Sequence, residues 1–445
     1  MAHTSPGSQD AGLASAPALL VELDGMLISS SLLWEALLLF VKRHLLRSWL
    51  LPLWLCQGRQ TLDRKLAAAV QINPATLPYD QQLLQFLGEQ RAQGRRILLG
   101  AASQQEAAEQ VASHLQLFDR TVQPSSTSGQ DRWHAAADTV CERLDASRHG
   151  AMRTGWHRPL LCAMRPRQWL KNLLVFVPML AGHALHLNTL AQSAVAFLAF
   201  SLCASSAYLL NDALDAQDDR LHPSKRHRPI AAGTLPLPVA LAASALLAPA
   251  GLLLSAWLDP WLLLAMAVYF VCTLAYSLHL KRLLMVDIVT LALLYSLRIL
   301  GGSAATHIEP SYWLLGFSFF LFLSLALLKR HSELFNLHRQ GKDKTRGRGY
   351  TTADRAPLGI MGINCAFLSV LVFMLYFSST TVQVLYPHPA FLMGIVPLLA
   401  FWLGRLWTLS FRGEVNEDPL LYVSRDRVSL VVIAGCILLA GLASH

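Results

Sequence analysis

Nine long apolar segments, all after Trp156, constrain the fold of this chain more than any other feature. A helix needs about 20 apolar residues to cross the roughly 30 Å hydrocarbon core of a bilayer, and each segment is close to that length. Hydrophobic residues make up 53% of the chain, which is unusual for a soluble protein. We therefore predict an all-α membrane bundle of nine transmembrane helices over residues 158–445. The helices are expected near residues 169–187, 190–211, 236–256, 260–280, 284–305, 311–329, 356–380, 389–410 and 427–444.

The loops between these segments differ in charge, and the difference predicts the orientation of the chain. Cytoplasmic loops of membrane proteins carry an excess of lysine and arginine. Every second loop here is basic, whereas the loops near residues 183–188, 259, 309 and 386–389 contain no lysine or arginine. The first residues lack a basic region followed by a long apolar core, so no cleaved signal peptide is expected. We predict a multi-pass protein of the bacterial inner membrane with a cytoplasmic N-terminus.

The part of the chain before the apolar segments has the composition of a soluble domain. Residues 1–17 are small and polar and are predicted to form a disordered tail. Within residues 18–150, the apolar runs from Ala18 to Leu23 and from Arg96 to Ala101 have the character of strands, and a polar helical stretch precedes the second. This alternation predicts a small α/β domain.

One stretch of this domain, Leu32 to Cys56, is nearly as apolar as a membrane span. Four basic residues interrupt it, which favours a helical cap or an interfacial hairpin over a clean span. These residues are Lys42, Arg43, His44 and Arg47.

A compact block of charge follows the second apolar segment and is the strongest functional signal in the sequence. Residues 208–233 read YLLNDALDAQDDRLHPSKRHRPIAAG. If the helix continues past the membrane surface, Asn211, Asp215 and Asp219 share one face, with Asp212 beside them. Carboxylates this close stay ionised only beside a cation. Oxygen ligands alone favour Mg²⁺, which usually shares its coordination sphere with substrate phosphates. The block therefore predicts a Mg²⁺ site at the cytoplasmic surface.

The bases that follow the acids suit phosphate binding. Lys225, Arg226 and Arg228 lie within the next turns and can hold the phosphate oxygens that a metal leaves free. A solvated helix end with ordinary surface charge is the competing interpretation. The compact succession of acids and bases disfavours it.

A second group of charged residues lies at the start of the fifth segment. Lys281 and Arg282 follow Tyr276 and are explained equally well as inside-facing topology signals. Asp287 and Arg298 lie within the segment, where a charge is costly and normally faces a partner or a substrate in the bundle interior. They are about three helical turns apart, too far for a direct pair on one helix. Each is therefore expected to serve another group.

Further bases precede the first segment and follow the sixth. Before the first, RPRQWLKN combines Arg165 and Lys171, which can reach phosphate, with the interfacial Trp169. After the sixth, the basic run from Lys329 to Tyr350 is explained equally well by positive-inside bias or by binding of anionic lipid.

The block from Asn211 to Asp219 resembles NDxxDxxxD, the first motif of the UbiA superfamily of intramembrane prenyltransferases. The nine segments match the helical bundle of that family, and Asp287 falls where its second aspartate motif belongs. The resemblance covers residues 158–445. The second motif departs from the commoner pattern, because DIVTL places Leu291 where a second aspartate would stand. That departure argues against two metals held symmetrically by two full motifs.

The combination of RPRQWLKN, NDxxDxxxDRxHPxKxxRPIAxG, YSxxLKR and KRxxEL is similar to one branch of this superfamily, which contains the polyprenyl-phosphate (decaprenyl-phosphate) phosphoribosyltransferases. Members of that branch transfer 5-phosphoribose from phosphoribosyl diphosphate to a polyprenyl phosphate and release diphosphate. The reaction lies on the route to lipid-linked arabinofuranose in the cell envelope. The resemblance therefore implies a Mg²⁺-dependent transferase with these two substrates.

The same resemblance implies roles for the charged residues. Mg²⁺ and the donor diphosphate would be held by Asn211, Asp212, Asp215 and Asp219. Contacts to substrate phosphates are implied for Lys225, Arg228, Lys281 and Tyr276. The acceptor phosphate would be received by Arg298, Arg165 or Lys171. Asp287 would orient the donor ribose or a metal-bound water.

The N-terminal domain, residues 18–150, resembles the haloacid dehalogenase-like phosphatases. VELDGMLISS stands where that family has its first strand and loop, and ILLGAASQ where it has the second motif. Glu22, Met26 and Ala101 replace the nucleophilic aspartate, the threonine and the second hydroxyl residue, so that only Asp24 remains. A carboxylate displaced by one methylene is a poor phosphoryl acceptor. The resemblance therefore predicts a catalytically dead scaffold.

Two other functions compete with phosphoribosyl transfer. A prenyltransferase of the same fold would move a polyprenyl chain from its diphosphate to an aromatic acceptor such as 4-hydroxybenzoate, and it would prefer a second DxxxD motif. A transporter or scaffold would bind lipid headgroups through its charged loops, and the aspartate stripe counts against it. The net charge of +9 is compatible with nucleic acid, anionic lipid or phosphorylated substrates and does not choose among them. From the membrane segments and the motifs, we expect no nucleic-acid partner. A homo-oligomer is left open.

Overall fold

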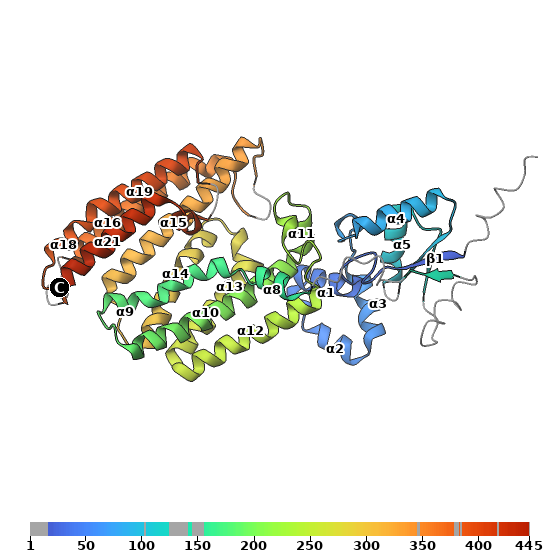
Figure 1. Ribbon diagram of the computed structural model, residues 1–445, viewed down its shortest axis with the longest axis horizontal. Coiled ribbons are helices and arrows are strands. Elements are labelled where there is room, and N and C mark those ends of the chain that lie inside the picture. Colours follow the sequence, from blue (N-terminus) through green and yellow to red (C-terminus); the bar gives the residue numbers. More distant parts are fainter. Residues whose placement is uncertain are drawn as a thin grey trace, which may run out of the picture. The chain divides into compact units, whose positions relative to one another are not determined.

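The structure is a computed structural model that describes residues 17–101, 104–123, 141–144, 155–344, 348–377, 382, 385–415 and 418–444. The chain divides into two compact units. Figure 1 labels helices and strands of both units. The first unit combines Met1–Arg165 with Tyr208–Leu246, and the second combines Pro166–Ala207 with Leu247–His445. The predicted disordered tail falls on residues 1–16, outside the described part, and on residue 17.

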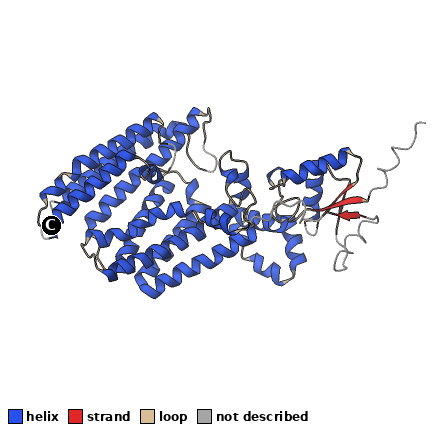
Figure 2. Cartoon of the chain, viewed as in Figure 1, coloured by secondary structure: helices blue, strands red, loops and turns tan. Residues whose placement is uncertain are grey.

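The first unit contains a parallel sheet of four strands in the order β3-β2-β1-β4. Figure 2 draws strands in red and helices in blue. Strand β1 (Ala18–Glu22) pairs with β2 (Ile97–Gly100) and with β4 (Cys141–Arg143), and β2 also pairs with β3 (Arg120–Val122). The two runs that the sequence marked as strands thus form β1 and β2. Parallel strands need crossover connections, and helices supply those from β1 to β2 and from β2 to β3. The helices of this unit are α1 (Leu32–Arg43), η1 (Leu45–Arg47), α2 (Leu50–Cys56), α3 (Arg59–Ala69), η2 (Pro74–Thr76), α4 (Gln81–Ala92), α5 (Gln105–Leu115), α8 (His157–Ala163), α11 (Ala216–Arg220) and η4 (Lys225–His227).

Asp24, just after β1, fixes where helix α1 begins. Its carboxylate accepts hydrogen bonds from the backbone N–H of Leu32 at 3.0 Å and from the Ser31 hydroxyl at 3.2 Å. A carboxylate satisfies N–H groups that the first helical turn leaves unpaired, and its charge suits a helix N-terminus. Helix α1 then buries Leu32, Ala36 and Phe40 in the core of the unit. The interrupted apolar stretch of the sequence is therefore folded as short helices and not as one span.

The second unit is helical throughout the part that the structure describes, and eight of its helices are long and apolar enough to cross a membrane. Two of them, α10 and α12, extend into the first unit at one end. Exposed apolar side chains such as Leu253 and Val431 stand on these helices, as a lipid-facing surface requires. The elements are η3 (Pro166–Phe176), α9 (Val177–Ala181), α10 (Leu187–Leu214), α12 (Leu237–Leu258), α13 (Pro260–Leu278), η5 (Leu280–Arg282), α14 (Val286–Thr306), α15 (Tyr312–Arg339), η6 (Thr352–Asp354), α16 (Arg355–Phe377), α18 (Ala390–Met393), α19 (Ile395–Arg412), α20 (Pro419–Val423) and α21 (Arg427–Ser444).

The predicted count of nine spans is not confirmed, because residues 169–187 do not form one long helix. They divide between η3, an 11-residue 3₁₀ helix, and the five-residue α9. Pro178 at the start of α9 cannot donate a helical hydrogen bond, which favours a break there. Polar side chains add a second cause, since Asn172 donates to the Ser201 hydroxyl at 3.0 Å and Trp169 to the Ser205 hydroxyl at 3.0 Å. These bonds hold η3 against α10.

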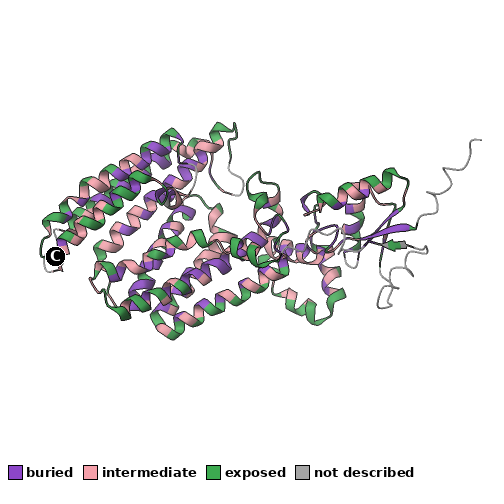
Figure 3. Cartoon of the chain, in the orientation of Figure 1, coloured by how far each residue is buried: buried purple, intermediate pink, exposed green. Residues whose placement is uncertain are grey.

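Close backbone packing fixes η3 on its other side as well. A Cβ atom at Gly302 of α14 would lie 2.0 Å from the Val175 carbonyl oxygen of η3, so only glycine fits. Helices α14, α15, α16 and α19 share a larger core that includes Leu327, Leu406 and Trp407. Each long helix carries buried as well as exposed positions (Figure 3).

Candidate active site

The aspartate block lies at the end of α10 and in α11, as the sequence predicted. The helix breaks at Asp215 but its hydrogen-bond pattern continues. The Asp215 N–H donates to the Asn211 carbonyl at 2.9 Å, and the Asp219 N–H donates to the Asp215 carbonyl at 2.8 Å. Asn211, Asp215 and Asp219 therefore stay one turn apart, in the first unit.

Two arginines bind the acids of this block. Arg165 donates to both oxygens of Asp212, at 2.6 and 2.7 Å, and its guanidinium lies over the ring of Tyr208. Arg228 donates from one nitrogen to Asp212 at 3.1 Å and to Asp219 at 2.6 Å. The two carboxylates are almost fully buried, at 2% and 3% exposure, so they need these partners. Asp212 and Asp219 thus share one cation.

The remaining acids of the block bind cations of their own. The Lys42 ammonium of α1 contacts Asp215 at 2.8 Å and Asp218 at 2.7 Å. Lys225 approaches Asp219 at 4.0 Å. Burial raises the pKa of the Asp219 carboxyl above its usual value, although Arg228 and Lys225 oppose the shift.

The residues present fit a Mg²⁺ ion held jointly with a substrate. Within the described part of the chain, no three acidic, histidine or cysteine side chains converge as a ready-made metal site. Asp212 and Asp219, however, both reach the same nitrogen of Arg228, so one cation can bind both. Mg²⁺ typically takes one or two protein carboxylates and completes its shell with water and phosphate oxygens. Two buried carboxylates beside cations that can hold phosphate match that demand.

Asp287, in the second unit, lies in the first turn of α14 and is completely buried. Its carboxylate accepts from Arg330 at 2.6 Å and from the Tyr350 hydroxyl at 2.5 Å. Arg330 also binds Glu333, which in turn accepts from Arg348 at 2.6 Å. The expectation that Asp287 and Arg298 do not pair with each other agrees with these contacts. The contacts of Asp287 and Glu333 with Arg330, Tyr350 and Arg348 connect α14, α15 and the loop before α16.

Lys171 meets a residue that the sequence did not single out. Its ammonium contacts Asp418 at 2.7 Å, and Lys329 contacts the same oxygen at 3.2 Å. Burial alone would raise the pKa of the Asp418 carboxyl, but Lys329 and Lys171 hold it well below its usual range. Two ammonium groups thus bind the same carboxylate oxygen of Asp418.

Arg298 is buried and its guanidinium is engaged on three sides. It donates to Asn172 at 2.8 Å, to the Leu294 carbonyl at 2.5 Å and to the Tyr269 hydroxyl at 2.9 Å. Tyr276 lies near the end of α13 and Lys281 in η5, on the same side of the bundle as Asp287.

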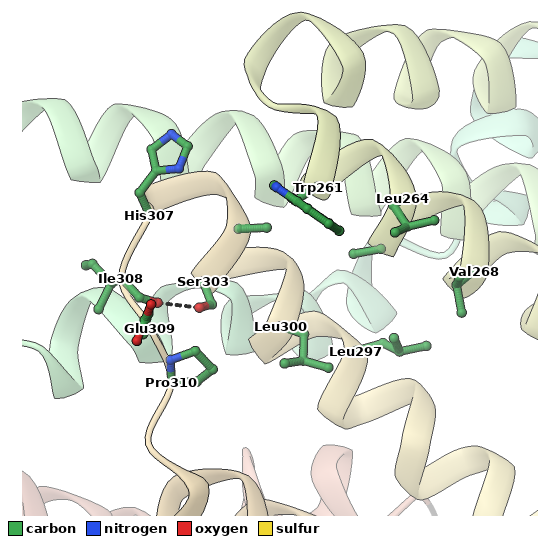
Figure 4. Close-up of a pocket in the computed structure, with 12 residues that line it drawn as sticks. Trp261, Leu264, Val268, Leu297, Leu300, Ser303, His307, Ile308, Glu309 and Pro310 are labelled. Atoms are coloured by element: carbon green, nitrogen blue, oxygen red, sulfur yellow. Dashed lines mark hydrogen bonds between the residues drawn. The ribbon is translucent and has the colours of Figure 1, made fainter.

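An apolar pocket of about 630 Å³ lies at the other end of α13 and α14 (Figure 4). Trp261, Leu264 and Val268 form one wall and Leu297 and Leu300 the other. None of the residues that line it is a lysine or an arginine. The pocket therefore lacks the groups that phosphate chemistry needs, and Asp287 stands at the opposite end of α14.

Three contributors to these clusters carry no motif in the sequence: Lys42, Asp418, and Glu35 of α1, which binds Arg220 of α11 at 2.7 Å. Lys42 had a weak signal, since it interrupts an apolar stretch, but that signal could only argue against a membrane span. Glu35 carried the same kind of signal, as a carboxylate in the apolar face of α1. Asp418 lies in a loop without a motif, so no local pattern marked it.

Comparisons with known proteins identify the family. A model of the UbiA prenyltransferase family matches residues 173–424. An uncharacterized protein of Sinorhizobium fredii is 32% identical over 92% of this chain and 88% of its own length. A decaprenyl-phosphate phosphoribosyltransferase of Mycolicibacterium smegmatis is 43% identical, over 41% of this chain and 59% of that protein. Among solved structures, a UbiA homolog from Archaeoglobus fulgidus bound to GPP and Mg²⁺ aligns with a TM-score of 0.48 and 17% identity, over 64% of this chain and 99% of that one. Because the family model spans more than half of the chain, this multi-pass membrane protein belongs to the UbiA prenyltransferase family and is an enzyme.

Proposed function

We propose that the enzyme transfers 5-phosphoribose from phosphoribosyl diphosphate to a polyprenyl phosphate at the cytoplasmic face of the bacterial inner membrane. The acceptor phosphate oxygen would form a bond to C1 of the ribose, while the bond from C1 to the diphosphate breaks and diphosphate leaves. That oxygen is already an anionic nucleophile, so the reaction needs no strong general base. The name of the Mycolicibacterium smegmatis relative, a decaprenyl-phosphate phosphoribosyltransferase, supports this transferred group and this class of acceptor.

The observation that carries the proposal is the environment of Asp287. A site for a prenyl diphosphate with two full aspartate motifs would need carboxylates at the second motif that are available to a metal. Here Asp287 is buried, salt-bridged to Arg330 and hydrogen-bonded by Tyr350, and Leu291 replaces a second acid. The acids of the first motif are then left as the main metal ligands. This arrangement favours a sugar diphosphate over a prenyl diphosphate as the donor.

The charged residues of the first motif would bind and orient the donor. Mg²⁺, when bound by Asp212, Asp215 and Asp219 with Asn211 beside them, would neutralise charge on the departing diphosphate. Arg228 and Lys225 stand next to these acids and would hold its phosphate oxygens.

The remaining bases would serve the other phosphates. Arg298, Arg165 or Lys171 would receive the acceptor phosphate, and Lys281 and Tyr276 would contact substrate phosphates. Asp287 would orient the donor ribose or a metal-bound water. A donor with a diphosphate and a 5-phosphate, together with a phosphorylated acceptor, would require several cations, and four cations surround the four carboxylates of the block.

We also propose that the N-terminal domain is a degenerate haloacid dehalogenase-like scaffold. Glu22 ends β1 where that family places its nucleophile, and Asp24 is committed to the start of α1. A phosphatase assay on the wild type and on Glu22→Asp tests the idea, and activity of the wild type would contradict it.

Transfer assays on the purified full-length protein test the proposed reaction. Labelled phosphoribosyl diphosphate and decaprenyl phosphate with Mg²⁺ should give a labelled lipid, while a prenyl diphosphate with 4-hydroxybenzoate should give no product. The reverse result would establish the aromatic prenyltransferase instead. Asp215→Asn should abolish turnover with an unchanged melting midpoint, whereas Asp343→Asn, at an exposed loop position, should retain full activity. Full activity of Asp215→Asn would refute the metal assignment.

A further inference from the structure

The aspartate motif of this enzyme is covered in part by helix α1, which lies more than 170 residues earlier in the chain. Lys42, in the last turn of α1, places its ammonium between Asp215 and Asp218, at 2.8 and 2.7 Å. Both partners belong to the first unit, so the contact lies within one compact body. A residue from the N-terminal part of the chain therefore stands among the acids that the family motif supplies.

A buried ion pair holds α1 in this position. Arg220 of α11 binds Glu35 of α1 at 2.7 Å, and their side chains are only 9% and 2% exposed. The same guanidinium donates to the Thr76 carbonyl at 2.9 Å and to the Ala231 carbonyl at 3.0 Å. A buried carboxylate without its partner would be costly. The contact is consequently a fixed part of the unit.

The backbone after α11 is fitted to the same surface. Gly233 has a φ of +76°, and a Cβ atom there would lie 1.7 Å from the Ser29 hydroxyl oxygen. Only glycine combines this conformation with so close an approach. The match with the relative from Sinorhizobium fredii covers 92% of this chain, so it includes most of the N-terminal domain, residues 18–150, as well.

We propose that Lys42 is a donor-binding residue, contributed by the N-terminal unit, that contacts the diphosphate group at the aspartate motif. This inference rests on the proposed function in one respect: the motif must bind a substrate that carries a diphosphate. It gives the N-terminal domain a role in the transferase site that does not require phosphatase chemistry.

The charges around the motif support this role. Four carboxylates meet four cations here: Asp212, Asp215, Asp218 and Asp219 are bound by Arg165, Arg228, Lys42 and Lys225. A divalent cation on the carboxylates would repel these positive groups, and the oxygens of a metal-bound diphosphate are the nearest alternative partners. Lysine is well suited to change its partner from the carboxylates to a diphosphate oxygen, because its ammonium is a compact charge on a flexible stem. The Lys42 side chain is 21% exposed, which leaves it a path to a ligand.

Binding of inorganic diphosphate to the purified full-length protein tests the proposal without relying on the identity of the donor. Calorimetric titrations in the presence of Mg²⁺ would compare the wild type with Lys42→Met, Lys42→Arg and Lys65→Met. We expect Lys42→Met to weaken binding about tenfold or more, as the loss of one charge-assisted hydrogen bond predicts. Lys42→Arg should recover part of the affinity. Lys65→Met is the matched control, because Lys65 lies on α3 of the same unit and contacts Gln57 and Trp54.

Steady-state kinetics add a second readout if phosphoribosyl transfer is observed. Lys42→Met should raise KM for phosphoribosyl diphosphate and leave KM for the polyprenyl phosphate unchanged. The melting midpoint of Lys42→Met should equal that of the wild type, because the pair between Glu35 and Arg220 that holds α1 is intact in this variant. An unchanged midpoint would exclude a folding defect as the cause of weaker binding. Equal or tighter binding of diphosphate by Lys42→Met would overturn the proposal and reduce Lys42 to a counter-ion of Asp215 and Asp218. A wild type that binds diphosphate but transfers no phosphoribose would contradict the proposed function and leave this inference standing.

Discussion

Replacing Asp287 by asparagine should destabilise the membrane bundle by an amount that the structure allows us to work out. The Asp287 and Arg330 side chains are both 0% exposed and lie 2.6 Å apart. Removing one partner of a buried ion pair typically costs about 3–5 kcal/mol, because the other charge stays buried. Arg330 keeps its contact with Glu333, and an asparagine can still accept from the Tyr350 hydroxyl. We therefore expect the lower end of that range, about 3 kcal/mol.

Thermal melting of the purified protein in one detergent measures the effect. A change of 1 kcal/mol shifts the midpoint by about 2–4 °C for a domain of roughly this size, so Asp287→Asn should lower it by roughly 6–12 °C. Arg339→Met is the matched control, because Arg339 lies exposed near the end of the same helix as Arg330. Its midpoint should stay within about 2 °C of the wild type.

A double variant separates the ion pair from other effects of the substitutions. Asp287→Leu combined with Arg330→Met removes both charges, and replacing a buried pair by apolar groups is often nearly neutral. The double variant should consequently lose less in melting midpoint than the added losses of the Asp287→Leu and Arg330→Met single variants. Single variants that melt like the wild type, or a double variant that is strictly additive, would refute the reasoning.

Two further predictions concern the second unit. Asp418→Asn should lower the melting midpoint by a constant amount between pH 8 and pH 5, and the difference should shrink only below the ordinary aspartate pKa of about 4. The sign follows from the lowered pKa of Asp418: its stabilising charge is fully present above the unfolded-state pKa and is lost as pH falls through the folded-state value. A difference that already changes between pH 7 and pH 5 would contradict this assignment. Gly302→Ala should lower the free energy of unfolding by about 1–3 kcal/mol, because the new methyl group meets the Val175 carbonyl. Gly404→Ala is its control, since no neighbour lies within 4 Å of that position. Equal melting midpoints for the two variants would contradict the close packing of η3 against α14.

The long apolar helices could be predicted because their signal is local. Length and hydropathy are properties of one continuous segment, and eight of the nine expected spans are present as long helices. The segment at residues 169–187 failed because apolar content does not reveal how a helix is interrupted. Pro178 and the hydrogen bonds of Asn172 and Trp169 decide its form, and the partners of those bonds lie on α10.

The candidate site was predictable only where its residues are neighbours in sequence. The acids and bases from Asn211 to Arg228 lie in one block, so helical spacing was enough to bring them together. Lys42, Glu35 and Asp418 reach their partners from 173, 185 and 247 residues away. A single charged residue carries no information on so distant a partner. The contacts made by Asp287 and Arg330 were hidden for the same reason.

The composition of the first unit has a consequence for its synthesis. Glu35 emerges from the ribosome 185 residues before Arg220, the residue that neutralises it. At about 5–20 residues per second, the interval lasts roughly 10–40 s, and a long apolar helix is made within it. Until Arg220 is made, the Glu35 carboxylate on the apolar face of α1 has to be solvated by water. The strands and helices of the N-terminal domain therefore assemble without the residues that later cover this face of α1. Completion of this soluble-looking domain is therefore coupled in time to insertion of α10 into the membrane.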